Sequence, residues 1–306
     1  MRIQKLDGLR GFLSLMIVFH NYDETKLPYF IGENFIIKQS WVLVDFFFML
    51  SGFVIYLNYQ NISNYIQLKG FLVKRFVRLY PLILYTTLIF LALTLIPNFF
   101  LKEVINNPES VTSMLYRTID TLLLTNSLPL FGVGHGLSIN GPSWSLSAET
   151  VSYLIFGISM LFFKKISQKL LIFFLIISSL LFSLLINTEL DFSFLRCIIS
   201  FNLGILLFEL NKIKYSVPDY FELIIPIIII IPLFMISNSS GLTSTLHGVI
   251  TANLAFFISL IILLKTKGVI TKFMEKKFMQ YLGKISYSVY LNHFIICILM
   301  SKISFT

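Results

Sequence analysis

Two ionisable side chains, Arg10 and His20, stand ten residues apart in an otherwise apolar stretch that begins with the phrase Leu6-Asp7-Gly8-Leu9-Arg10-Gly11. In a helix they would be about 15 Å apart along the axis, at about 1.5 Å per residue. An ionisable side chain in hydrocarbon is costly and therefore marks a candidate functional site. A permanent cation at a membrane surface with an imidazole further in suits chemistry on a molecule that arrives from one side.

A second cationic group consists of Arg75 and Arg78, with Lys74 beside them and Pro81 shortly after. The spacing of three residues puts both guanidinium groups on one helical face, where they can bind phosphate oxygens bidentately. A lipid-binding anchor would use the same residues. The functional interpretation is favoured because the pair is expected to face the same side of the membrane as Arg10.

Two carboxylates and one more arginine complete the charged candidates within apolar runs. Asp45 needs a partner there or must stay protonated, and we predict that it orients the His20 imidazole. Glu149 follows the phrase at residues 142–148. It is either a first-turn carboxylate that the helix dipole stabilises, or a residue that orients an acceptor hydroxyl or a histidine. Arg196 is expected to have Glu149 or Asp45 as its counter-charge.

Four residues are candidates for substrate binding: Arg196 and the further residues Ser143, Trp144 and His293. Each also has a plainer interpretation. Trp144 suits an interfacial aromatic belt, and a lone histidine on an apolar helix is more often a hydrogen-bonded core residue. The cysteines Cys197 and Cys297 lie in apolar runs and are expected to pack rather than to pair or to bind metal.

The composition is that of a membrane protein. Hydrophobic residues make up 56% of the 306 residues and charged residues 13%, about half of the roughly 25% usual in soluble domains. The mean hydropathy is +0.83. No Gly-rich nucleotide loop, zinc pattern or RNA-binding signature is present, so nucleic acid and metal are not expected partners. The first apolar stretch carries Arg10 and no small-residue cleavage site follows, so we expect it to stay as an anchor.

Nine apolar runs are long enough, or nearly so, to cross a bilayer. They fall at about 9–22, 41–59, 79–99, 146–163, 170–187, 192–210, 221–237, 247–264 and 281–300. A tenth, at 115–131, is interrupted by polar residues and by Pro129, and it indicates a short re-entrant or interfacial helix. The predicted fold is all-α: a polytopic transmembrane helix bundle with about nine crossings plus this short helix.

Lysine and arginine set the expected orientation. With the N-terminus in the cytoplasm, eighteen of them fall inside and five outside, with Arg196 within a run. The five are Lys26, Lys38, Lys102, Arg117 and Lys302. The net charge of +9 is then explained by topology. We predict a multi-pass protein of the plasma or inner membrane with its N-terminus in the cytoplasm.

The ordered phrases of the chain resemble the acyltransferase-3 family of integral membrane acyltransferases. The matching stretches are Leu6–Gly11 with His20, Asp45–Phe53, Arg75–Pro81, Ser143–Glu149 and Gly283–His293. Each phrase is weak alone, but five in order along nearly the whole chain are specific. The resemblance implies a single membrane domain over 1–306.

The resemblance also implies an activity. A family member takes an acyl group, commonly acetyl, from cytoplasmic acyl-CoA and delivers it to a hydroxyl of an extracytoplasmic or lipid-linked glycan, with membrane lipids around it. By match to the family's motifs, His20 is the catalytic histidine and Glu149 the acidic residue. Arg10 is the basic residue of the first motif, and Arg75 and Arg78 are the pair expected to hold acetyl-CoA or another acyl-CoA. Whether His20 acts as a base or carries the acyl group covalently stays open.

One departure leaves alternatives. Family members usually continue past the His293 segment into another span, whereas this chain stops at Thr306. A shortened member or an inactive, truncated relative would both fit. A transporter or flippase of glycan precursors would use the same buried ions as a substrate pathway.

Overall fold

The computed structural model describes residues 3–22, 27–100, 110–128, 138–162, 193–238 and 242–303, together with 173, 176–178 and 180–181. Regular secondary structure in these residues is helical throughout, as predicted. The chain forms two compact units, which are described separately. The first unit comprises Met1–Gln60, Lys169–Ile186 and Arg196–Tyr290, and the second comprises Asn61–Gln168, Asn187–Leu195 and Leu291–Thr306.

Six helical segments of the described residues are long and apolar enough to cross a membrane. They are Ser40–Tyr59, Tyr65–Ile96, Gly141–Phe162, Phe194–Asn211, Asp219–Ser237 and His247–Lys265. Each overlaps one of the nine predicted runs, which confirms a polytopic helical membrane protein. Of the other three runs, 9–22 lies within helix α1 apart from its last residue and 281–300 lies within helix α13. Most of the run at 170–187 falls outside the described residues.

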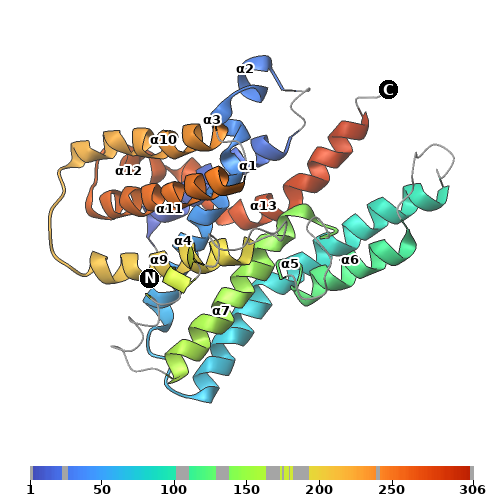
Figure 1. The fold of residues 1–306 in the computed structure, drawn as a ribbon, viewed down its shortest axis with the longest axis horizontal. Helices are drawn as coiled ribbons and strands as arrows, with labels where there is room; N and C mark the ends of the chain where they lie inside the picture. Colours follow the sequence, from blue (N-terminus) through green and yellow to red (C-terminus); the bar gives the residue numbers. More distant parts are fainter. Residues whose placement is uncertain are drawn as a thin grey trace. The chain divides into compact units, whose positions relative to one another are not determined.

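The first unit is built around long helices joined by short ones (Figure 1). Its elements are α1 (Gln4–Asn21), α2 (Tyr29–Gly32), α3 (Phe35–Lys38), the 3-10 helix η2 (Ser40–Val42), α4 (Leu43–Tyr59), α9 (Ser193–Asn211, from Arg196 on), the 3-10 helix η4 (Asp219–Ile224), α10 (Ile225–Ser237), α11 (Leu242–Lys265), α12 (Val269–Met274) and α13 (Lys277–Ile303, up to Tyr290). Helices α10 and α11 pack side by side.

Glycines allow α1 to approach α12 and α13 closely. A Cβ on Gly8 would collide with the carbonyl oxygen of Met274, and one on Gly283 with that of Asp7. A Cβ on Gly11 would come within 2.5 Å of the Gly283 nitrogen. Small residues at such contacts let helix backbones pack tightly in a membrane, where van der Waals contact contributes much of the attraction. The glycines of two motif phrases therefore have a packing role, and they fix the part of α1 that carries Arg10.

The second unit contains α5 (Tyr65–Phe100), α6 (Val111–Leu123), the 3-10 helix η3 (Gly141–Ser143), α7 (Trp144–Phe162) and α13 from Leu291. Helix α5 has 36 residues, so it is about 54 Å long, whereas the hydrocarbon core of a bilayer is about 30 Å thick. It begins fourteen residues before the predicted run at 79–99. Hydropathy marks only apolar residues, whereas Lys and Arg are good helix formers and allow the helix to begin before the apolar run.

Helix α6 has thirteen residues and is too short to cross, as expected for the interrupted run that begins at Leu115. It ends at Leu124, which has the left-handed conformation with φ of 56°. The Ser147 hydroxyl donates to the Leu124 carbonyl at 2.6 Å, and the backbone N–H of Ser127 donates to the Ser147 oxygen at 3.1 Å. These bonds hold the end of α6 on the first turn of α7.

Candidate active site

His20 lies in the last turn of α1, at the opposite end of that helix from Lys5. Its Nδ1 is 3.2 Å from the carbonyl oxygen of Ile37 in α3. A carbonyl oxygen can only accept a hydrogen bond, so Nδ1 must carry the proton. In the neutral ring Nε2 then holds the lone pair. A partner on one ring nitrogen that fixes the tautomer is the arrangement expected of a positioned base.

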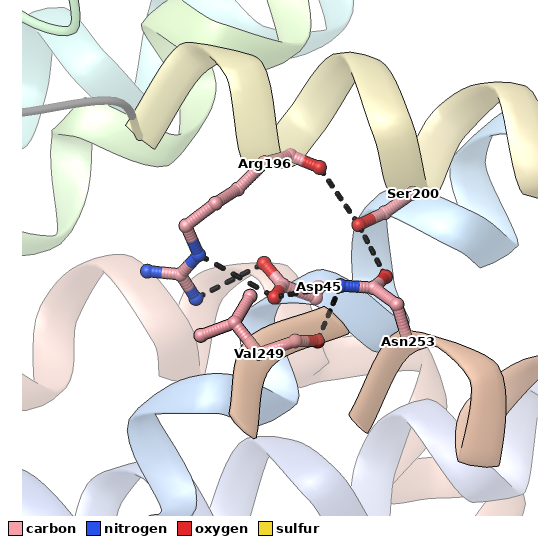
Figure 2. Close-up of polar contacts among 5 residues, drawn as sticks. All are labelled: Asp45, Arg196, Ser200, Val249 and Asn253. Carbon is pink, nitrogen blue, oxygen red and sulfur yellow. Dashed lines mark hydrogen bonds and ion pairs between the residues drawn. The ribbon is translucent and has the colours of Figure 1, made fainter. Parts of the chain in front are cut away.

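Asp45 forms an ion pair with Arg196. It is one of the two carboxylates, Glu149 and Asp45, that were expected as the counter-charge of Arg196. The Arg196 Nη2 is 3.0 Å from Asp45 Oδ1, and the Arg196 Nε donates to Asp45 Oδ2 at 3.4 Å. The Asp45 side chain is fully buried. Figure 2 shows the carboxylate of α4 lying between the guanidinium of α9 and the Asn253 amide of α11. Close packing of α4 and α9, where a Cβ on Gly52 would collide with the Phe201 carbonyl, brings the two charges together.

Neutral side chains complete this cluster. The Asn253 Nδ2 donates to Asp45 Oδ2 at 3.2 Å, and the Ser200 hydroxyl contacts Asn253 Oδ1 at 2.7 Å and the Arg196 carbonyl at 2.8 Å. The Arg196 guanidinium carbon lies 4.7 Å from the Trp41 ring centroid. A buried carboxylate thus has a cation and an amide as partners, as burial requires.

The structure alters the predicted link between Asp45 and His20. The hydrogen bonds and the ion pair of the Asp45 carboxylate go to Arg196 and Asn253, and the carbonyl of Ile37 takes the place expected for a carboxylate at His20 Nδ1. The guanidinium, as a permanent cation, is the stronger partner for a buried carboxylate. One route from Asp45 to His20 is the segment 37–41, which contacts His20 through the Ile37 carbonyl and the Arg196 guanidinium through Trp41.

In the second unit, α5 and α7 run antiparallel and side by side (Figure 1). A Cβ on Gly157 would lie 2.5 Å from the Leu68 side chain. The Phe71 ring packs edge-on against Tyr153 and Phe156, with centroid distances of 6.0 and 5.6 Å. Phe71 therefore faces α7, and Tyr153 faces α5.

This register places Arg75 and Glu149 opposite one another. Arg75 is four residues after Phe71 and Glu149 is four residues before Tyr153, and a step of four residues keeps each on the same helical face. Because the helices are antiparallel, both steps go in the same direction. The Tyr153 hydroxyl donates to Glu149 Oε1 at 2.6 Å. Glu149 is thus level with the first arginine of the predicted donor-binding pair.

The remaining predicted residues of the second unit differ in exposure. Arg78 is exposed and Arg75 partly buried.

Ser143 is buried, accepts from the Asn126 amide at 2.9 Å and donates to the Asn140 carbonyl at 2.7 Å. Trp144 is partly exposed. His293 is buried beside the Phe294 ring. Substrate binding by Ser143, Trp144 and His293 stays a prediction.

Sequence reasoning missed five residues of these clusters: Ile37, Trp41, Tyr153, Ser200 and Asn253. Three of them had a signal. Asn253 is polar inside the run at 247–264, Ser200 follows Arg196 by four residues, and Tyr153 follows Glu149 by four. The Ile37 carbonyl had none, because a backbone acceptor is not marked by residue type. Within the described residues, no three His, Cys, Asp or Glu side chains gather as a metal site.

The fold and these clusters define a polytopic membrane protein with a tautomer-fixed histidine, an arginine pair and a buried carboxylate paired with a guanidinium. The chain belongs to the acyltransferase-3 family: the family described as "Acyltransferase domain" matches residues 3–306. It is therefore an acyltransferase. It is also 31% identical over 164 residues to "Protein 2 in picA locus" of Rhizobium radiobacter, a match that covers 50% of this chain and 79% of that protein. No solved structure matches the chain.

Proposed function

We propose that the protein transfers an acyl group, acetyl in the first instance, from cytoplasmic acyl-CoA to a hydroxyl of an extracytoplasmic or lipid-linked glycan. The observation that carries this proposal is His20, whose Nδ1 is held by the Ile37 carbonyl at 3.2 Å. A positioned histidine base contributes about 10²–10⁴-fold to such transfers. The membrane is the plasma or inner membrane, with the N-terminus of the chain in the cytoplasm.

In the proposed reaction, His20 Nε2 takes the proton of the acceptor hydroxyl as its oxygen attacks the thioester carbonyl carbon. The carbon–sulfur bond then breaks, and the sulfur leaves as the CoA thiolate, which the proton from His20 converts to the free thiol. No net proton or electron is consumed. Direct transfer of this kind needs no covalent acyl-histidine, although the same residue could form one.

The donor is assigned to Arg10, Arg75 and Arg78. Guanidinium groups bind phosphates bidentately, and CoA carries several. The length of α5 supports this role, since about 24 Å of the helix extends past the thickness of a hydrocarbon core. The acceptor is assigned to Glu149, Ser143, Trp144, Arg196 and His293. By the register of α5 and α7, Glu149 also lies level with Arg75.

Replacing both Arg75 and Arg78 with alanine should raise the KM for acyl-CoA about 100-fold or more, because each lost charged contact contributes about 1.5–3 kcal/mol and every 1.4 kcal/mol is a factor of ten. Release of free CoA by the full chain in vesicles measures this. The pair Lys69→Ala and Lys214→Ala removes the same charge elsewhere and should leave KM unchanged. An unchanged KM in the arginine variant would reassign Arg75 and Arg78 to lipid anchoring. A transporter or flippase would release no CoA at all.

Removing the Tyr153 hydroxyl should also weaken use of the donor. Tyr153→Phe keeps the ring that packs on Phe71 but deletes the 2.6 Å bond to Glu149, so Glu149 is held less firmly opposite Arg75. We expect kcat/KM for acyl-CoA to fall about tenfold, as for loss of one hydrogen bond to a charged group. Tyr85→Phe, at an exposed position of α5, is the matched control. Equal kinetics in the two variants would contradict this role of Tyr153.

A further inference from the structure

The corner between α12 and α13 carries lysines and aromatic rings on its outer side. We call this surface the basic–aromatic ledge and define it by Lys272, Phe273, Lys276, Lys277, Phe278 and Tyr281. All six side chains are exposed. The exposed fractions of Phe278 and Tyr281 are 62% and 60%, which is unusual for aromatic rings in contact with water alone.

The inner side of the same corner is packed. Thr271, Met274, Met279 and Leu282 are buried, and Met274 lies against Gly8 of α1. The corner is therefore an amphipathic element whose apolar inner face already has its partner. The outer rings are an additional apolar surface, and the lysines surround them.

The ledge is fixed to the ends of two candidate spans. Helix α11 ends at Lys265, and three residues separate it from the start of α12 at Val269. The 3-10 helix η4 contains the first residues of the span Asp219–Ser237. The buried carboxylate of Glu222 in η4 accepts from the backbone N–H of Gly268 at 2.8 Å and from that of Thr271 at 3.0 Å. The ledge must accordingly lie where these spans leave the hydrocarbon.

Lys5 ties α1 to the same place. Its ammonium donates to the carbonyl oxygens of Leu263 at 2.5 Å and Thr266 at 2.8 Å, at the end of α11. Partial burial lowers the pKa of Lys5, while the carboxylates of Glu222 and Glu275 act in the opposite direction. The elements η4, α1 and α11 thus hold the backbone of the ledge in place. The side chains of the ledge project from this fixed backbone.

The charge of the ledge is complementary to an anionic surface. Residues 267–284 contain five lysines and one glutamate, a net charge of +4. The Lys276 ammonium lies 5.3 Å from the Phe273 ring centroid, so the two kinds of side chain are interleaved. Aromatic rings favour the headgroup level of a bilayer, and lysines next to a span attract anionic headgroups.

We propose that the basic–aromatic ledge binds headgroups of anionic phospholipids in the leaflet where α11 ends. The rings of Phe273, Phe278 and Tyr281 enter the boundary between headgroups and acyl chains, and the lysines contact the phosphates. Because α12 packs on α1, bound lipid also supports the helix that carries Arg10 and His20. This binding does not depend on the proposed acyl transfer.

A local photochemical test measures which lipid occupies the ledge. The full chain, with p-benzoylphenylalanine in place of Phe278, is placed in vesicles of equal parts phosphatidylglycerol and phosphatidylcholine. After illumination, mass analysis gives the ratio of the two lipid adducts. We expect phosphatidylglycerol to predominate, and Lys272→Gln with Lys276→Gln to lower its preference about fivefold for each lysine removed.

The matched control is Lys69→Gln with Lys214→Gln, which removes two other exposed lysines and should leave the adduct ratio unchanged. Equal amounts of the two lipid adducts in the wild type would overturn the proposal. So would the same adduct ratio in the ledge variant and in the control variant. So would loss of the phosphatidylglycerol adduct when CoA is added, because the ledge would then be a site for a soluble phosphate-bearing molecule. The melting temperatures of all variants should agree, since every substituted lysine is exposed.

Discussion

His20→Ala should lower the rate of acyl transfer by about 10²–10⁴-fold, the contribution of a positioned general base. The loss should appear in kcat with little change in the KM for acyl-CoA, because His20 is assigned to the proton of the acceptor and not to the phosphates of the donor. Release of free CoA in the presence of acceptor membranes is the measurement. A variant with the rate of the wild type would remove His20 from the mechanism.

His20→Asn separates the base from the hydrogen bond. An asparagine amide can still donate to the Ile37 carbonyl, which accepts from Nδ1 in the wild type, but it has no basic nitrogen. We expect this variant to keep the melting temperature of the wild type and yet to be as inactive as His20→Ala. His247→Ala, which alters an exposed histidine of α11, should keep full activity and serves as the matched control.

Much of the fold could be predicted because hydropathy and helix length are local properties. The six candidate spans overlap six predicted runs, and α6 is the short helix expected at the interrupted run. The residue at which α5 begins was harder to predict from the sequence. Lys69, Lys74 and Arg75 precede the predicted apolar run at 79–99, so hydropathy did not assign them to the crossing, although long cationic side chains are compatible with a helix that continues past an apolar run.

The candidate site was predictable in its residues more than in its contacts. Charges in apolar runs identified Asp45, Arg196 and Glu149, because each is costly in a membrane. Their partners depend on helix crossings and registers, which residue types alone do not determine. The glycines of the first motif are an example. In the sequence they belong to a motif that carries the basic residue Arg10, whereas in the structure Gly8 and Gly11 let α1 approach α12 and α13.

Removing one member of the buried ion pair should strongly destabilise the protein. Arg196→Met leaves the fully buried Asp45 carboxylate without its cation, and loss of one partner of such a pair typically costs about 3–5 kcal/mol. The Asn253 amide, at 3.2 Å, can compensate only in part. We expect a clear fall in the apparent melting temperature of the protein in vesicles, and a similar fall is not expected for Lys212→Met, which alters an exposed ion pair.

The double variant Asp45→Asn with Arg196→Met distinguishes a structural role of the pair from a catalytic one. It removes both charges, so it should recover much of the stability lost in Arg196→Met. If Asp45 acts on His20 through Trp41 and the segment 37–41, activity should stay low even where stability returns, since Trp41 has lost the guanidinium that lies 4.7 Å from its ring. Recovery of both stability and activity would limit the pair to folding. Full activity and full stability in Asp45→Asn alone would exclude both roles, because a buried amide cannot replace the charge that Arg196 requires.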